Sequence, residues 1–211
     1  MIRIGVDDAG RGVVLGPLIM AGALVSDASA QRLNALNVRD SKMYKDAKTV
    51  VNRFMEIGSM MDKFTVRLMT PKELNENNQN GITIDWGMIP YLVDLVTELG
   101  KDVDNPKIII GNMQHKEDLI AELHRRGFAD VSVEASAEED IAVAAASVVA
   151  TAQFELELRK LRLEWGEIGS GNPNDPKTIA WLTEYYKKKR KWPSFVRTYY
   201  KTITRMESEM R

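Results

Sequence analysis

The stretch Met1-Ile-Arg-Ile-Gly-Val-Asp7-Asp8-Ala-Gly10-Arg11-Gly12 decides how the rest of the chain is interpreted. Its apolar run from Ile2 to Val6 predicts a buried strand. Because side chains alternate along a strand, the adjacent carboxylates Asp7 and Asp8 are expected on opposite faces or at the strand end. A carboxylate that faces the interior must be paired or bind a metal. The stretch therefore predicts either a polar edge turn or a site for a metal or a phosphate.

The Gly10-Arg11-Gly12 turn favours a site for a metal or a phosphate. Glycine lets the backbone approach a ligand closely. An arginine between two glycines is a ready contact for a phosphate group. The same residues are also typical of a polar turn after an edge strand, so the motif depends on support from the rest of the chain.

Composition sets the class of protein. The chain has 211 residues, 44% of them hydrophobic, which is enough for one core, or for one domain with a small appendage. It has no cysteine, which excludes disulfides and thiolate metal sites. We expect no signal peptide and no apolar run long enough to cross a membrane, and therefore a soluble, cytoplasmic protein.

Positive charge gathers near the C-terminus, although the net charge is only -1. Lys187–Lys191 form an unbroken basic run, and Arg197, Lys201 and Arg205 follow it. This distribution predicts a local phosphate-binding face or a solvated helix surface. Arg197 and Lys201, about one helical turn apart, are expected to share a face that follows one phosphate strand.

Hydrophobic periodicity predicts alternating strands and helices. The strands are expected at residues 2–6, 13–25, 63–69, 107–110 and 131–135, and the helices at 28–36, about 46–57, 84–99, 117–126, 138–163 and 176–190, with a last helix after Pro193. Residues 75–81 are predicted to be a loop, and Trp86 is expected to face inward. The order favours an α/β fold with a mixed central sheet.

Two further features divide the chain. Residues 142–150 are small and apolar all round, which predicts a buried, closely packed helix. Gly169–Pro176 is rich in turn-forming residues. We therefore predict a main domain at 1–168 and a basic helical C-terminal extension at 169–211 that packs on it.

Several motifs together resemble the ribonuclease HII family, especially its archaeal branch. The family opens with Asp-Glu-Ala-Gly-Arg-Gly, similar to residues 7–12, and Asp40-Ser41-Lys42 matches its Asp-Ser-Lys loop. Further matches are Ala144–Ser147, the segment Gly169–Pro176, and Val196-Arg197 with Lys201-Thr202. The matches span residues 3–202 in order, and they imply a ribonuclease H-like fold with a C-terminal helical extension.

The resemblance also implies a function. The family cleaves the RNA strand of RNA–DNA hybrids, or cleaves beside a ribonucleotide in duplex DNA, with two divalent metals held by four carboxylates. Two cations can stabilise the attacking water and the leaving oxygen. Mg²⁺ and Mn²⁺ both accept oxygen ligands. The Gly10-Arg11-Gly12 backbone would read the ribose 2′-hydroxyl, and nucleic-acid contacts would come from Asp40, Ser41, Lys42, Ser147, Arg197 and Lys201. A monomer is expected.

The four carboxylate positions match only in part. The first is Asp7, and the second is Asp8, one methylene shorter than the family's Glu. The third falls on Gly111-Asn112, where Asn112 offers only a neutral oxygen. The fourth falls on Ala137, although a one-residue gap would place Glu138 there. Two smaller departures are Thr151 for a lysine and Asn172 for an aromatic residue.

Two functions therefore stay open. The first is a variant nuclease that uses Asp7, Asp8 and Glu138 with help from Asn112 and Mg²⁺ or Mn²⁺. The second is a non-catalytic relative that binds RNA–DNA hybrid through Gly10–Gly12, Asp40–Lys42 and the basic tail. A small-molecule phosphate enzyme is a third class, but the chain lacks a Lys-Ser/Thr phosphate-binding loop and a Rossmann glycine pattern.

Overall fold

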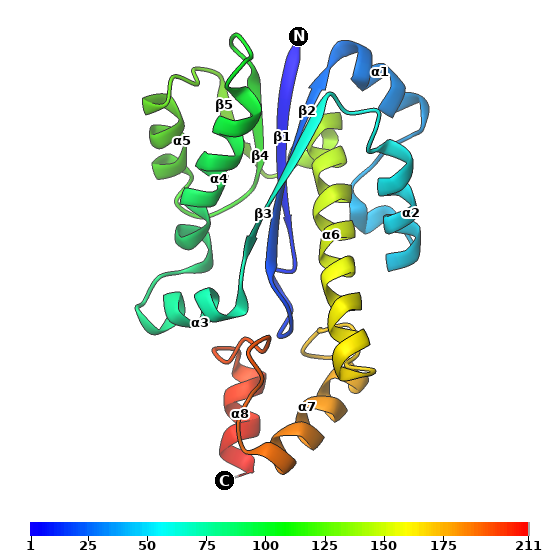
Figure 1. Cartoon of the computed structure of the whole chain (residues 1–211). Helices are drawn as coiled ribbons and strands as arrows, with labels where there is room; N and C mark the ends of the chain where they lie inside the picture. The colour runs from blue at the N-terminus through cyan, green and yellow to red at the C-terminus, as the bar shows by residue number, and fades with distance from the viewer. Residues whose placement is uncertain (211) are drawn as a thin grey trace.

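A five-stranded mixed sheet forms the centre of the computed structural model, which describes residues 1–210 (Figure 1). The strands are β1 (Ile2–Ala9), β2 (Leu18–Ser26), β3 (Lys63–Met69), β4 (Lys107–Gly111) and β5 (Val131–Glu134), in the order β3-β2-β1-β4-β5. The three strands β1, β2 and β3 pair antiparallel. Strand β4 runs parallel to both β1 and β5. The predicted mixed α/β sheet is confirmed.

Helices cover both faces of the sheet (Figure 1). Helix α6 (Ile141–Trp165) lies against β1 and β2, with α1 (Asp27–Ala35) and α2 (Ala47–Ile57) packed on it. On the other face, α4 (Ile84–Gly100) lies over β2 and β3, and α5 (Lys116–Arg125) lies against β5. Each face buries its own apolar cluster. The sheet thus separates two cores. The surroundings of each β1 side chain depend on which of the two cores it faces.

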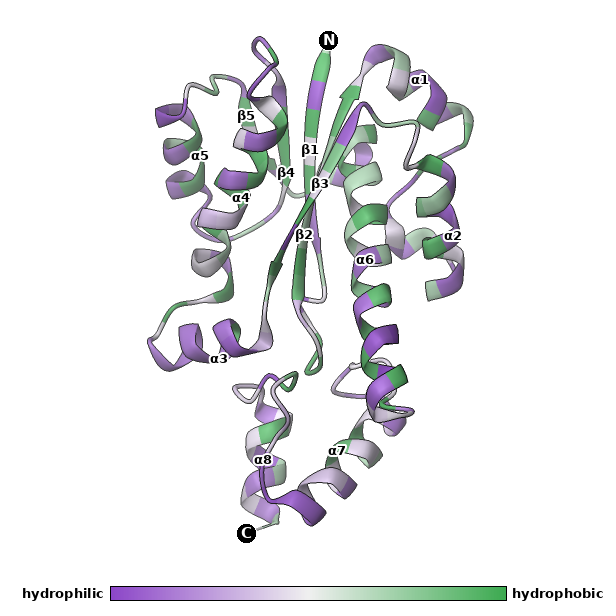
Figure 2. Ribbon diagram, viewed as in Figure 1, coloured by the Kyte–Doolittle hydropathy of each residue, from purple (hydrophilic) through white to green (hydrophobic). Residues whose placement is uncertain are grey.

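Helix α6 packs unusually close to β1. A Cβ atom added to Gly5 would stand 2.1 Å from the backbone carbon of Ala142, so no side chain fits between strand and helix. The first half of α6 is mostly hydrophobic on the side that Figure 2 shows, and residues 142–150 are all buried, as predicted. By length and composition α6 passes as a membrane span, contrary to the sequence expectation, but 67% of its apolar window is buried inside the fold.

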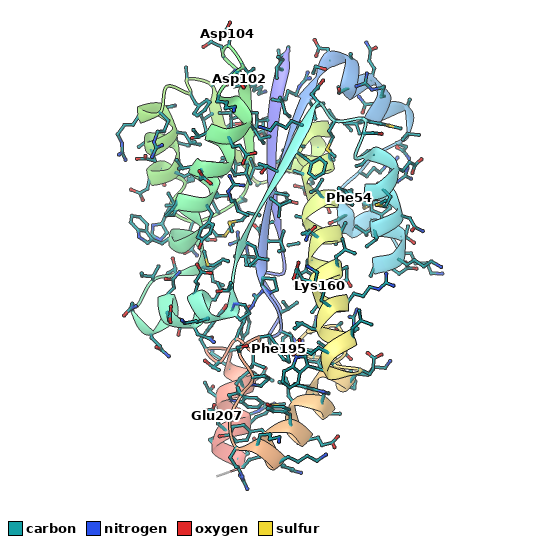
Figure 3. All side chains as sticks on the ribbon, in the orientation of Figure 1. Phe54, Asp102, Asp104, Lys160, Phe195 and Glu207 are labelled. Atoms are coloured by element: carbon teal, nitrogen blue, oxygen red, sulfur yellow. The ribbon has the colours of Figure 1, made fainter. Side chains whose placement is uncertain are left out.

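The C-terminal segment returns to the start of the chain. It contains α7 (Pro176–Lys189) and α8 (Lys201–Glu209), which lie beyond the carboxyl end of β1 (Figure 1). Leu15 and Val196 form a β-bridge, and Val14 N donates to Gly171 O at 2.8 Å. Phe195 packs between α7 and the end of α6 (Figure 3), 5.2 Å from the Trp165 ring. The C-terminal segment therefore supports the loop that follows β1.

Several expectations about element boundaries are wrong, and the strand expected at 13–25 begins only at Leu18. Residues 75–81 are not a loop throughout, because α3 (Pro71–Gln79) includes most of them. Thr70 and Glu73 form a reciprocal capping box at its start, and this local stabilisation outweighs the poor helix propensity of its asparagines. The last helix begins at Lys201, well after Pro193.

The start of α6 and the side of Trp86 were also predicted wrongly. A short 3-10 turn, η2 (Ala137–Glu139), precedes α6, and Asp140 caps the helix by accepting from Ala142 N at 2.8 Å. A carboxylate that caps a helix competes well with continuing the helix through it. Trp86 lies at the start of α4 and is 46% exposed, since its side chain lies beside His115 outside the core.

Candidate active site

A cleft of about 560 Å³ lies at the carboxyl end of β1, where β1, β4, α6 and the short helix η1 (Ser41–Met43) meet. Parallel strands β1 and β4 end at the same edge of the sheet, which is where α/β folds commonly place their sites. Most of the predicted site residues line it: Asp7, Asp8, Gly10, Arg11, Asp40, Ser41, Lys42, Asn112, Glu138 and Ser147.

Asp7 is a partly buried acid of the cleft. It shares the α6-facing side of β1 with Gly5, two residues earlier. Burial raises the pKa of Asp7 to about 6, the negative charges of Asp8 and Asp40 add to the rise, and the hydroxyl of Ser147 partly offsets it. A bound cation would stabilise the ionised form of such an acid.

Asp8 faces the other side of β1, as strand alternation predicts. Both of its oxygens accept from Arg11, Oδ1 from Nη2 at 2.7 Å and Oδ2 from Nε at 3.2 Å. The Arg11 side chain is therefore held in an ion pair and is not a free phosphate contact in this conformation.

Asp85, on the first turn of α4, is the second acid that holds Arg11, and sequence reasoning missed it. Its Oδ1 pairs with Arg11 Nη1, and its Oδ2 accepts from Gln114 N at 2.9 Å. Although burial lowers it, the pKa of Arg11 is raised by these hydrogen bonds and charges of Asp8 and Asp85. In sequence Asp85 reads as an ordinary acid that favours a helix N-terminus; only its burial distinguishes it.

The Asp40-Ser41-Lys42 segment is fixed to α6. Ser41 Oγ lies 2.9 Å from Ser147 Oγ and accepts from Thr151 Oγ1 at 2.8 Å. Asp40 accepts from Lys42 N at 2.7 Å, while the Lys42 side chain stays 83% exposed at the cleft edge. Ser41 and Ser147, both buried, hold this loop, whereas the exposed Lys42 side chain pairs with Asp40 Oδ2 at 3.5 Å at the edge of the cleft.

The third acid position is a glycine, Gly111, so no side chain extends from it into the cleft. A Cβ atom added to Gly111, at the end of β4, would lie 3.2 Å from Asp7 Oδ1. A side chain at position 111 would therefore lie directly beside the buried carboxylate. Asn112 follows and lines the cleft, so it offers the amide oxygen that the sequence suggested.

Two adjacent residues, Ala137 and Glu138, are the candidates for the fourth acid position. Ala137 is buried in the short turn η2, while Glu138 lines the cleft beside Lys42 and helps to raise the pKa of that lysine, after the larger effect of Asp40. Glu138 is therefore the acid from this segment that reaches the cleft. Glu155 on α6 is a further lining acid that sequence reasoning missed; burial raises its pKa.

The donor chemistry of the cleft fits a hard divalent cation, because every candidate ligand is an oxygen. Asp7, Glu138 and Asn112 are free of ion pairs among the described residues, and Asp8 is bound to Arg11. No three Asp, Glu or His side chains within residues 1–210 are gathered as for a metal ion. The cleft thus offers oxygen donors without the preassembled four-carboxylate set that the resemblance implies.

Arg197 and Lys201 do not share a surface, so that expectation is wrong. Arg197 precedes α8 and is completely buried, where its guanidinium donates to Gly16 O at 2.8 Å and to Gly10 O at 2.6 Å. Tyr200 Oη donates to Arg11 O at 2.5 Å. The C-terminal segment supports the Gly10-Arg11 backbone from below, and Lys201 stays exposed on α8.

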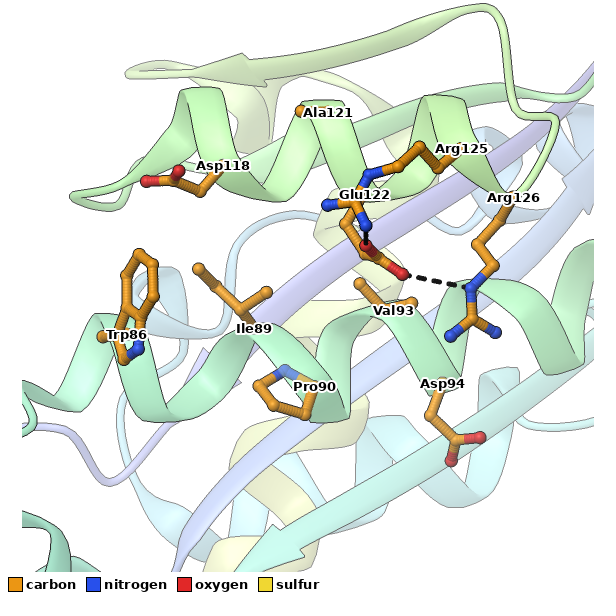
Figure 4. Close-up of a pocket in the computed structure, with 10 residues that line it drawn as sticks. All are labelled: Trp86, Ile89, Pro90, Val93, Asp94, Asp118, Ala121, Glu122, Arg125 and Arg126. Carbon is orange, nitrogen blue, oxygen red and sulfur yellow. Dashed lines mark hydrogen bonds and ion pairs between the residues drawn. The ribbon is translucent and has the colours of Figure 1, made fainter.

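A second cavity, of about 470 Å³, lies between α4 and α5 and contains none of the predicted residues (Figure 4). Trp86 stands at one end, and Glu122 pairs with both Arg125 and Arg126 (Figure 4). Because these arginines already have a carboxylate partner, this cavity does not offer a free basic surface to a phosphate backbone.

Comparisons with known proteins agree with this geometry. The family model for ribonuclease HII matches residues 4–203. A ribonuclease HII from Pyrococcus horikoshii is 32% identical, over 98% of this chain and 93% of its own. The crystal structure of the ribonuclease H2 from that organism superposes with a TM-score of 0.86 at 31% identity, covering 100% of this chain and 99% of the other.

A third similarity is to the ribonuclease HII from Archaeoglobus fulgidus, solved in complex with PCNA. It gives a TM-score of 0.81 at 30% identity over 95% of this chain and 96% of the other. The mixed sheet and its cleft thus define a ribonuclease H-like nuclease fold. Within that class, the chain belongs to the ribonuclease HII family, whose enzymes depend on divalent metal ions.

Proposed function

We propose that this chain is an endoribonuclease of the ribonuclease HII type, acting as a monomer in the cytoplasm. Its substrates would be the RNA strand of RNA–DNA hybrids, or ribonucleotides embedded in duplex DNA. The observation that carries the proposal is the partly buried Asp7 in a cleft beside the Gly10-Arg11-Gly12 turn, within a chain that matches the family almost end to end.

The chain's own groups divide the work. The backbone of Gly10–Gly12 would contact the ribose 2′-hydroxyl, the group that distinguishes RNA from DNA. Lys42, exposed at the cleft edge, would contact a phosphate. Lys201 would contact a phosphate of the same nucleic-acid strand farther from the cleft. Ser147 and Arg197, both buried, would hold the Asp40–Lys42 loop and the Gly10 backbone in place.

Asp7, Asp8, Glu138 and Asn112 would hold Mg²⁺ or Mn²⁺. A divalent cation bound there would neutralise charge that develops on the scissile phosphate and help to deprotonate a water. Asp7 would be fully ionised when the cation is present, since a nearby positive charge lowers the pKa of a buried carboxylate. Asp8 would share its oxygens between this role and Arg11.

The decisive experiment is a cleavage assay on a labelled DNA duplex with one ribonucleotide, beside an RNA–DNA hybrid, in Mg²⁺ and then in Mn²⁺. Asp7→Asn is the control for contaminating nuclease. Cleavage by the wild-type protein that disappears in Asp7→Asn supports the proposal. Absence of cleavage with salt-sensitive hybrid binding would instead identify the non-catalytic relative, the alternative that the family comparisons do not favour.

A further inference from the structure

Arg11 lies between the two glycines of the Gly10–Gly12 turn, and its side chain pairs with two carboxylates. Asp8 lies on β1 and Asp85 on α4, so the guanidinium joins the sheet to the helix above it. Asp85 is only 8% exposed. A buried carboxylate is costly unless it is paired, and Arg11 supplies that pairing.

The second oxygen of Asp85 connects to another part of the cleft. It accepts from the backbone N–H of Gln114 at 2.9 Å, in the segment between β4 and α5 that also contains Asn112. One carboxylate therefore joins the turn after β1 to the segment after β4. These are the two segments that carry the turn for the ribose and the altered third acid position.

The turn is supported differently on its other side. There Arg197 and Tyr200 donate to the carbonyl oxygens of Gly10 and Arg11, which fixes the backbone but makes no bond to the Arg11 guanidinium. On the α4 side, Asp85 is the group that prevents Arg11 from resting on Asp8 alone.

We infer that Asp85 is a positioning residue, which holds Arg11 and the segment after β4 in the arrangement that the cleft needs. The inference rests on the proposed function, because positioning matters only if the cleft cleaves. Asp85 also offsets part of the positive charge of Arg11, which lines the cleft that a polyanion would enter. It therefore opposes substrate binding while it supports turnover, two effects of opposite sign.

Asp85→Asn tests this pairing of effects, because the amide retains an oxygen for Gln114 N and loses the charge. In EDTA, affinity for hybrid should rise about threefold, as one repulsive charge is removed. In divalent metal, kcat should fall about tenfold or more, since misplaced groups lose orientation. Asp85→Glu, which keeps the charge, should recover part of kcat. A role only in folding would weaken binding and kcat together.

Asp94→Asn is the matched control. Asp94 lies on the same helix, paired with Arg67 on the surface, so its variant should change neither quantity by more than about twofold. In an Arg11→Gln background, Asp85→Asn should cost little further kcat, because both substitutions break the same contact. Additive losses, or a kcat for Asp85→Asn within twofold of the wild type, would overturn the inference.

Amide hydrogen exchange gives a readout that does not need activity. Asp85→Ala should speed exchange at Gln114 at least about tenfold over the wild type, since its hydrogen-bond acceptor is lost. If the wild-type protein shows no cleavage, the proposed function fails, while this measurement still decides whether Asp85 holds the segment. Unchanged exchange at Gln114 would refute it.

Discussion

At the scale of single residues, the cleft depends on one carboxylate that the fold makes expensive to ionise. Asp7 is surrounded by α6 and β4, and its neighbours Asp8 and Asp40 add negative charge. Such groups commonly mark functional sites, where a ligand relieves the cost. Asp7 should therefore lower the stability of the metal-free protein at neutral pH, and this has a direct test.

Asp7→Asn should stabilise the metal-free protein at pH 8. The pKa of Asp7 is raised from 3.8 to about 6 in the fold, which corresponds to a cost of roughly 3 kcal/mol once the group is ionised. That cost is complete above pH 6, falls as the folded state takes up its proton, and is gone below about pH 3.8. Calorimetry in EDTA should show a higher Tm for Asp7→Asn at pH 8 and equal Tm values near pH 3.5.

The sign of this difference is the critical point. A lower Tm for Asp7→Asn at pH 8 would show that ionised Asp7 stabilises the metal-free fold, contrary to its buried surroundings. Asp46→Asn should give the opposite sign at pH 8, because a hydrogen bond from the Thr49 backbone lowers the pKa of the exposed Asp46, and its ionised form therefore stabilises the fold.

Gly111→Asp restores an acid beside Asp7. The added Cβ would be 3.2 Å from Asp7 Oδ1, and a small rotation of the aspartate accommodates it. Two carboxylates so close repel, so Gly111→Asp in EDTA should unfold about 1–2 kcal/mol more easily than its neutral match Gly111→Asn. Titration with Mn²⁺ should reverse the order of the two Tm values. No recovery with Mn²⁺ would mean that position 111 does not face a cation.

At the scale of elements, the contact between β1 and α6 places Asp7 and Ser147 in one cleft. Gly5 lets the helix backbone touch the strand, and the alanines of α6 keep that distance short. Interiors are packed too tightly to accept an added atom at such a contact. The position of the cleft residues therefore depends on a residue that takes no part in the chemistry.

Gly5→Ala should be severely destabilising, by about 3 kcal/mol or more, because its Cβ would overlap the Ala142 backbone. Gly12→Ala is the matched control, since nothing lies within 4 Å of a Cβ atom added there. Urea unfolding of the two variants measures the difference in the free energy of unfolding. Equal stabilities would show that α6 can move away from β1 at little cost.

At the scale of the whole molecule, the C-terminal extension combines support and charge. Its first part ties residues 14–16 to residues 171 and 195–197 through backbone hydrogen bonds. Its helix α7 ends in exposed lysines, Lys187 to Lys189. The division of the chain at residue 168 stays a prediction, and the many contacts to the β1 turn indicate that the extension acts together with the main domain.

Lys189→Glu should flatten the salt dependence of hybrid binding. Each phosphate contact contributes about 0.9 to the slope of log K against log salt concentration on duplex DNA, so the slope should fall in magnitude by about 1. Lys101→Glu, at the opposite end of the sheet after α4, is the matched change of charge and should leave the slope unaltered. Equal slopes for Lys189→Glu and the wild type would place the nucleic acid elsewhere.

The class of fold, most of its elements and the acid Asp7 in the cleft could be predicted from the sequence. These depend on local patterns: an apolar run that ends in carboxylates, alternation along 63–69, and a helix of small residues that must be buried. The family motifs also located the two carboxylate positions that differ from the family. Gly111 and Ala137 are found by counting from the neighbouring motifs along the chain.

The partners of each polar group could not be predicted in the same way, because they depend on how the chain folds. Arg11 is bound by Asp85, 74 residues away, and Arg197 is buried against carbonyls near the other end of the chain. No local pattern distinguishes a buried Asp85 or Arg197 from a solvated one, because burial and pairing arise when distant segments pack together. Periodicity predicts on which face of the sheet each side chain of a strand lies. The residues that it contacts there depend on the folding of the whole chain.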